Sequence, residues 1–171
     1  KSFKDGSIIK EGINTVIIGK PNAGKSSILN LLSRTDRAIV TDIAGTTRDT
    51  LTENIKLSGI SLNITDTAGI RQTDDVVESI GVQKAIEASN NADLNLVVID
   101  GLLPLDKEDT ELLESVKDKN AIILLNKSDK ELKLSIEDIK KYSEKDVIIF
   151  SAKENIGVDE LEDMIKAKFI S

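Results

Sequence analysis

The chain has 171 residues, of which 39% are hydrophobic and 31% are charged, a composition typical of a globular domain. It contains neither cysteine nor histidine, which excludes disulfide frameworks, thiolate zinc sites and acid–base catalysis by imidazole. The formal net charge of −7 argues against a nucleic-acid-binding surface on this chain, because affinity for phosphate backbones comes largely from Lys and Arg.

Residues 1–12 are polar and contain glycine, so we expect a lead-in segment followed by one domain over residues 13–171. No apolar stretch approaches the ~20 residues of a membrane span, and the first residues lack a signal-peptide pattern. We therefore expect a cytoplasmic protein without a membrane partner.

A predicted strand over residues 13–18 leads into a glycine-rich loop, residues 19–26, that fits the pattern G-x-x-x-x-G-K-[ST]. Apolar residues at helical spacing follow, to about residue 33. In this pattern, backbone N–H groups and the helix N-terminus bind phosphates, Lys25 reaches the β- and γ-phosphates, and the Ser26 hydroxyl binds Mg²⁺. The other loop residues predicted to contact the nucleotide are Asn22, Ala23, Gly24 and Ser27. The alternative is a glycine-rich turn with a surface lysine.

Residues 34–48 show no regular periodicity and predict a loop of about fifteen residues, a length that is usually functional or disordered. Near its end is Gly-Thr-Thr-Arg, residues 45–48. A threonine here can close over Mg²⁺ and the γ-phosphate when GTP is present and release after hydrolysis. We expect Thr47 to be this ligand, with Thr46 as the second choice.

Residues 50–57 and 60–66 alternate apolar and polar side chains around Ser58-Gly59, which predicts an antiparallel hairpin. Asp-Thr-Ala-Gly, residues 66–69, follows it. We expect Asp66 to hold Mg²⁺ through water and the Gly69 N–H to contact the γ-phosphate, although Asp66 could instead cap a helix or turn. A helix with residues 82, 85, 86 and 89 on one face is predicted next.

The second half of the chain alternates buried strands with helices. Continuous apolar runs predict strands at residues 96–99, 121–125 and 147–150. Helices are predicted over residues 106–119, which begin acidic and end basic, over the Lys- and Glu-rich residues 130–145, and at the chain's end. The residues expected to face the core from the first and last of these helices are Leu112, Leu113, Val116, Val158, Leu161 and Ile165. This pattern predicts an α/β fold with an open, mostly parallel sheet of about six strands, one antiparallel edge hairpin, and helices on both faces.

Polar motifs follow the predicted strands, and ligands of open α/β sheets bind at the carboxyl ends of strands. In Asn-Lys-Ser-Asp, residues 126–129, the Asp129 carboxylate can accept two hydrogen bonds from guanine that adenine does not offer. In Ser-Ala-Lys, residues 151–153, the Ala152 N–H would meet the guanine oxygen. Taken alone, each motif also fits an ordinary polar loop. In register with the phosphate loop they predict a GTP/GDP site whose base side comprises Asn126, Lys127, Asp129, Ser151, Ala152 and Lys153.

These four motifs, in this order and spacing, resemble the translation-factor class of P-loop GTPases. Three longer stretches, GKPNAGKSSILN, AIVTDIAGTTRDT and DTAGIRQTDDVVESIG, are similar to the GTPase domain of the MnmE (TrmE) family. The resemblance covers nearly the whole chain and implies a Ras-like P-loop GTPase fold that hydrolyses GTP. Members of the family modify the wobble uridine of certain tRNAs with a flavin partner, MnmG (GidA), and carry further domains, so we expect this chain to be one excised domain.

The resemblance also implies how water is activated. Ras-like proteins orient the attacking water with a glutamine directly after the D-x-x-G glycine, where this chain has Ile70. The resemblance places the catalytic glutamate of the family at Glu78, with Thr47 and Gly69 completing the catalytic set. Glu78 could instead be a solvated carboxylate in the first turn of a helix, and Asp74 and Asp75 are weaker rivals.

A second implication is a K⁺ ion in place of an arginine finger. It would be held by Asn22 and by the first switch loop at Asp42, Ile43 and Gly45, and completed when two domains meet as a homodimer. Arg48 or Arg71 could serve as a finger instead. Two other functions remain open, namely a K⁺-dependent GTPase of the HydF or Der type, and a GTP-dependent interaction module that does not hydrolyse.

Overall fold

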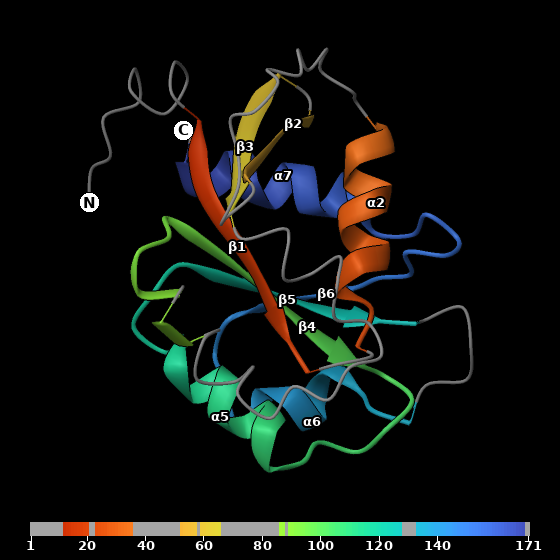
Figure 1. Ribbon diagram of the computed structural model, residues 1–171. Coiled ribbons are helices and arrows are strands. Elements are labelled where there is room, and N and C mark those ends of the chain that lie inside the picture. The colour runs from red at the N-terminus through yellow and green to blue at the C-terminus, as the bar shows by residue number, and fades with distance from the viewer. Residues whose placement is uncertain are drawn as a thin grey trace.

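Six strands form a single sheet at the centre of the protein, whose computed structural model describes residues 12–20, 23–35, 52–57, 59–65, 86–87, 89–127 and 133–169. The strand order is β2-β3-β1-β4-β5-β6 (Figure 1). The strands are β1 (Ile13–Gly19), β2 (Thr52–Leu57), β3 (Ile60–Thr65), β4 (Leu94–Asp100), β5 (Ala121–Asn126) and β6 (Asp146–Ile149). Every neighbouring pair is parallel except β2 and β3, which form the antiparallel hairpin at one edge. The predicted mixed sheet with one antiparallel hairpin is confirmed.

Helices cover both faces of this sheet, as predicted (Figure 1). On one face α2 (Lys25–Thr35) and α7 (Val158–Phe169) contribute side chains to one apolar cluster. On the other, α5 (Lys107–Ser115) and α6 (Ile136–Lys140) belong to a second cluster. Every residue of β4 and β5 is buried, because these central strands are covered on both sides.

Strand β4 begins at Leu94, before the predicted start at residue 96. A polar residue, Asn95, interrupts the apolar run, yet it is fully buried. Its side-chain amide donates to the backbone carbonyl of Asn120 at 3.1 Å, which compensates the donor for the water that it loses. Tertiary pairing therefore extends the strand beyond its apolar sequence.

Two helices are shorter than their sequences indicate. α5 ends at Ser115, so Lys117 and Lys119 lie beyond it and the expected basic last turn is absent from the helix. The predicted core residues Leu112, Leu113 and Val116 are nevertheless buried. The prediction for residues 130–145 was wrong in length over the part that the structure describes, because α6 has five residues. A capping box between Ser135 and Asp138 begins it, and a turn follows after Lys140.

The last helix matches its prediction, with Val158, Leu161 and Ile165 buried against the sheet. Of the predicted helix around residues 82–89, the structure describes Ile86, Glu87 and Ser89, and Ser89 is buried. The predicted loop over residues 34–48 was wrong at its start, because α2 continues to Thr35. Residues 36–48 of that loop and residues 1–11 of the lead-in segment lie outside the described residues. No helix in the described ranges is both long and apolar enough to cross a membrane.

Candidate functional site

The carboxyl ends of β1 and β5 bring the predicted phosphate and base motifs together. Strand β1 ends at Gly19, where the glycine-rich loop begins, and β5 ends at Asn126. The Asn126 side chain is buried and bridges two loops. Its Nδ2 donates to the carbonyl of Ala23 at 2.9 Å, and its Oδ1 accepts from the N–H of Ala152 at 3.2 Å. One side chain therefore connects the phosphate loop with the loop that follows β6.

Close packing explains the two glycines of the phosphate loop. Gly24 has φ +108°, a conformation that side-chain-bearing residues rarely adopt, and a Cβ there would lie 2.1 Å from Nδ2 of Asn126. At Gly19 a Cβ would lie 2.7 Å from the carbonyl oxygen of Val98 in β4. The first glycine lets the loop leave the sheet beside β4, and the second makes room for Asn126.

Helix α2 begins within the predicted motif, at Lys25. The Lys25 ammonium donates to the carbonyls of Gly19 at 2.7 Å and Lys20 at 3.3 Å, so it lies over the loop. Ser26 is half-buried and Ser27 exposed in the first turn. That turn contains no acidic residue, so no carboxylate in it offsets the partial positive charge of the helix N-terminus. A positive helix end beside a lysine suits an anion.

On the base side, two of the predicted residues form part of a tight turn. Ser151 and Ile156 exchange two backbone hydrogen bonds of 2.9 Å, and the Ser151 hydroxyl accepts from the N–H of Glu154 at 3.1 Å. Ala152 is held by Asn126, while Lys153 is exposed. Lys127 has φ +73°, and its ammonium lies 3.1 Å from Oδ2 of the buried Asp100. The structure therefore gives Lys127 a protein carboxylate as partner.

Sequence reasoning missed a second ion cluster beside the phosphate loop. Nζ of Lys20 lies 2.9 Å from Oδ2 of Asp106 and 3.2 Å from Oδ2 of Asp109. Burial alone would lower the pKa of Lys20, but the hydrogen bonds and charges of the two carboxylates outweigh it and raise that pKa. The D-x-x-D spacing of a capping box was visible in the sequence. Nothing in the sequence indicated that Lys20 reaches it across 86 positions.

Several predicted residues lie outside the described residues, so their roles stay predictions. They are Asn22, Asp42, Ile43, Gly45, Thr46, Thr47, Asp66, Gly69, Glu78 and Asp129. Of the three predicted Mg²⁺ ligands, Ser26 is described, and its hydroxyl sits at the start of α2. The predicted set of two hydroxyls and a carboxylate has the hard oxygen donors that Mg²⁺ prefers.

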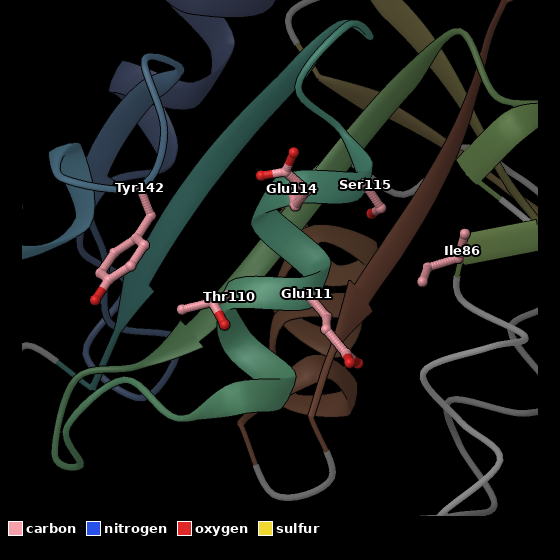
Figure 2. A pocket seen from close by; sticks show the side chains of 6 residues that line it. All are labelled: Ile86, Thr110, Glu111, Glu114, Ser115 and Tyr142. Atoms are coloured by element: carbon pink, nitrogen blue, oxygen red, sulfur yellow. The ribbon is translucent and has the colours of Figure 1, made fainter.

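An open groove of about 550 Å³ runs along the outer side of α5 (Figure 2). The described residues that line it are Ile86, Thr110, Glu111, Glu114, Ser115 and Tyr142. None of them is a predicted nucleotide-site residue, so the groove is separate from the site built on β1 and β5.

Comparison with known proteins indicates a GTPase. Residues 14–127 match the family described as 50S ribosome-binding GTPase. The chain is 50% identical over 166 residues to the tRNA modification GTPase MnmE of Lachnoclostridium phytofermentans, covering 97% of this chain and 36% of that protein. It is 51% identical over 165 residues to MnmE of Clostridioides difficile, covering 96% of this chain and 36% of that protein. The chain thus spans about a third of the length of these curated relatives.

A solved structure with a similar fold is a variant of Era from Aquifex aeolicus bound to GDP·AlF₄⁻. It shares 27% identity and a TM-score of 0.63, over 93% of this chain and 57% of that one.

Proposed function

The chain belongs to the 50S ribosome-binding GTPase family, and on that premise we propose that it is the GTP-hydrolysing domain, over residues 13–171, of a tRNA modification GTPase of the MnmE type. The observation that carries the proposal is the Asn126 bridge, which joins the phosphate loop to the loop of Ala152. A nucleotide bound between these loops would contact both with its two ends.

The described residues suit the phosphate end of GTP. Backbone N–H groups of the loop and the N-terminus of α2 would face the phosphate oxygens. Lys25 would exchange its carbonyl partners for phosphate oxygens, an exchange that favours the more strongly charged acceptor. Mg²⁺, held by Ser26, Thr47 and, through water, Asp66, would neutralise phosphate charge.

The base end would be read by Asp129, with the Ala152 N–H contacting the guanine oxygen. Asn126 would hold the loops rather than read the base, because its amide is already occupied on both sides by Ala23 and Ala152. Lys127, paired with Asp100, would place its aliphatic stem beside the base. A base that cannot donate hydrogen bonds to Asp129 would leave this carboxylate unsatisfied, and that cost would select strongly for guanine.

Hydrolysis requires a group that orients water, and Ile70 cannot supply it. We assign this role to Glu78, with Thr47 and Gly69 at the γ-phosphate. The charge that an arginine finger supplies elsewhere would come from K⁺ held by Asn22, Asp42, Ile43 and Gly45 in a homodimer of two such domains. The parent protein would act in the cytoplasm on tRNA with MnmG. The support for these finer assignments is the identity of about half of the residues to curated MnmE proteins.

The first test is GTP turnover by the purified chain in KCl and in NaCl at equal ionic strength, over a range of protein concentrations. We expect turnover per molecule to be faster in KCl and to rise with concentration, because two domains complete the K⁺ site. The Glu78→Ala variant should bind GTP as the wild type does and lose turnover.

Equal rates in both salts at every concentration would contradict the K⁺-filled dimer while leaving the GTPase intact. Binding without turnover in either salt would instead favour the non-hydrolysing interaction module.

A further inference from the structure

The phosphate loop carries two lysines, and the structure gives them different partners. Lys25 faces loop carbonyls, whereas the ammonium of Lys20 faces two carboxylates at the start of α5, 2.9 Å from Asp106 and 3.2 Å from Asp109. We propose that Lys20 is a positioning residue, which ties the phosphate loop to the N-terminus of α5 and thereby holds the loop in the shape that binds nucleoside phosphates. This inference rests on the proposed GTP site.

Burial makes the tie between Lys20 and α5 strong. The side chain of Lys20 is 11% exposed and that of Asp109 is 3% exposed, so both charges have lost most of their water. Oδ2 of Asp109 also accepts from the N–H of Asp106 in the capping box, and its Oδ1 has no hydrogen-bond partner among the described residues. Asp109 therefore depends on Lys20 for its only nearby cation in the described part of the chain, and separating the two would leave a buried charge uncompensated.

Backbone hydrogen bonds connect the anchored Lys20 to the rest of the loop. Its carbonyl accepts from the N–H of Ala23 at 3.2 Å and from the ammonium of Lys25 at 3.3 Å. A fixed Lys20 side chain therefore fixes the carbonyl that closes the turn of the loop. α5 is a firm support, because Leu112 and Leu113 pack in the same apolar cluster as residues of β1. The loop is thus attached to the fold through β1 and, separately, through α5.

The alternative is that Lys20 binds phosphate directly. One lysine and two aspartates carry a combined charge of −1, so the positive charge of Lys20 is already more than balanced and the cluster would repel an approaching phosphate. The hydrogen bonds and charges of the two carboxylates outweigh burial and raise the pKa of Lys20, which keeps its ammonium protonated, while burial raises the pKa of Asp109. The net negative charge of the cluster therefore favours a role for Lys20 as an anchor rather than as a phosphate ligand. As an anchor, Lys20 would raise the affinity for nucleotide by holding the loop preorganised.

The two roles predict opposite effects of Asp109→Asn on the affinity for GDP, measured as the dissociation constant of a fluorescent GDP. Asparagine keeps the acceptor of the capping box and removes the buried one of the two charges that hold Lys20, while the more exposed Asp106 stays. An anchor requires weaker binding, by about tenfold, the size expected for one lost charge-assisted hydrogen bond. A direct phosphate ligand would be released by this change and would bind GDP more tightly.

Lys20→Met keeps the apolar stem, and Lys20→Met/Asp109→Asn removes both charges, so the double variant avoids an unpaired buried aspartate. We expect both to weaken GDP binding, and the double variant to lose less than the sum of the single changes, because the two residues act through one contact. Lys20→Arg should restore part of the affinity. At saturating GTP, kcat should change less than KM, because positioning acts on binding.

The matched control is Lys168→Met, which removes an ion pair of 3.4 Å with Asp146, between α7 and β6. It should leave GDP binding unchanged. If the wild type fails to bind GDP, the proposed function fails. If the wild type binds while Asp109→Asn and the double variant bind equally well or more tightly, the anchor is overturned and the GTP site stands.

Discussion

At the scale of single residues, the site depends on polar side chains that connect loops distant in sequence. Asn126 is 2% exposed and satisfies an acceptor in one loop and a donor in another. Buried polar groups of this kind stabilise a unique arrangement when satisfied and are costly when a partner is lost. Asn126 therefore sets the distance between the two loops, and the absence of a side chain at Gly24 lets it approach.

Asn126→Asp tests this bridge with almost no change in shape. The variant keeps an acceptor for Ala152 but replaces the donor to Ala23 with an oxygen, which faces the carbonyl and repels it. We expect the free energy of unfolding to fall by about 1–3 kcal/mol, the cost of an unmade buried hydrogen bond, and GDP binding to weaken. Urea unfolding and GDP titration measure the two effects. Asn120→Asp, at an exposed position, is the control and should change neither.

At the scale of elements, side-chain caps determine where the short helices begin. α5 and α6 both start with a capping box, Asp106 with Asp109 and Ser135 with Asp138. In α5 the cap also receives Lys20, so the same two aspartates start a helix and anchor a loop. α6 has five residues, too few to be stable by itself, so the helix is stabilised by its capping box and by the burial of Ile139.

The cap of α6 predicts a pH dependence. The hydrogen bond from the backbone N–H of Ser135 holds the pKa of Asp138 below its usual value of 3.8, helped by the Ser135 hydroxyl and by Lys141. A carboxyl whose folded pKa is lowered contributes stability that is present above pH 3.8 and is lost as the pH falls through the folded pKa. Asp138→Asn should therefore unfold with a shallower dependence on pH below this value.

Acid titration of the unfolding midpoint, followed by circular dichroism, measures this slope. Asp163→Asn changes an exposed carboxylate of α7 and serves as the control. An acid limb of the same slope in Asp138→Asn and the wild type would rule out a contribution of the cap.

At the scale of the whole molecule, the parallel sheet gathers the site at one edge. β1, β4, β5 and β6 run parallel, so the loops after them emerge on the same side although they are separated by up to 130 positions. Two apolar clusters, one on each face, hold the sheet rigid beneath these loops. A ligand that joins the loops should therefore stabilise the fold as a unit.

GDP with Mg²⁺ should raise the free energy of unfolding by mass action. At a free concentration of one hundred times the dissociation constant, the increase expected for one site is about 2.7 kcal/mol. The urea midpoint should rise with GDP and stay unchanged with ADP at the same concentration. Adenine lacks the pair of N–H donors from which Asp129 would accept hydrogen bonds in guanine. An equal shift with ADP would show that the base side does not discriminate.

The sequence by itself determined the class of fold and the position of the phosphate loop. Uninterrupted apolar runs such as β5 are long enough to indicate buried strands, and the glycines, Lys25 and Ser26 form a local pattern with its own chemistry. It did not reveal the true length of α6 or the start of β4 at Leu94, because a short capping box and the buried side-chain hydrogen bond of Asn95 decided these boundaries.

Only the tertiary structure decided how the motifs are joined. Asn126 and Ala152 belong to separate motifs in the sequence, and their contact exists because β5 and β6 are adjacent in the sheet. No local pattern in the sequence marks Lys20 and Asp109 as partners. Their ion pair forms because β1 and α5 pack together and exclude water from between the two side chains. Local patterns specify local chemistry, whereas contacts across many positions depend on burial and strand order, which a single stretch of sequence does not contain.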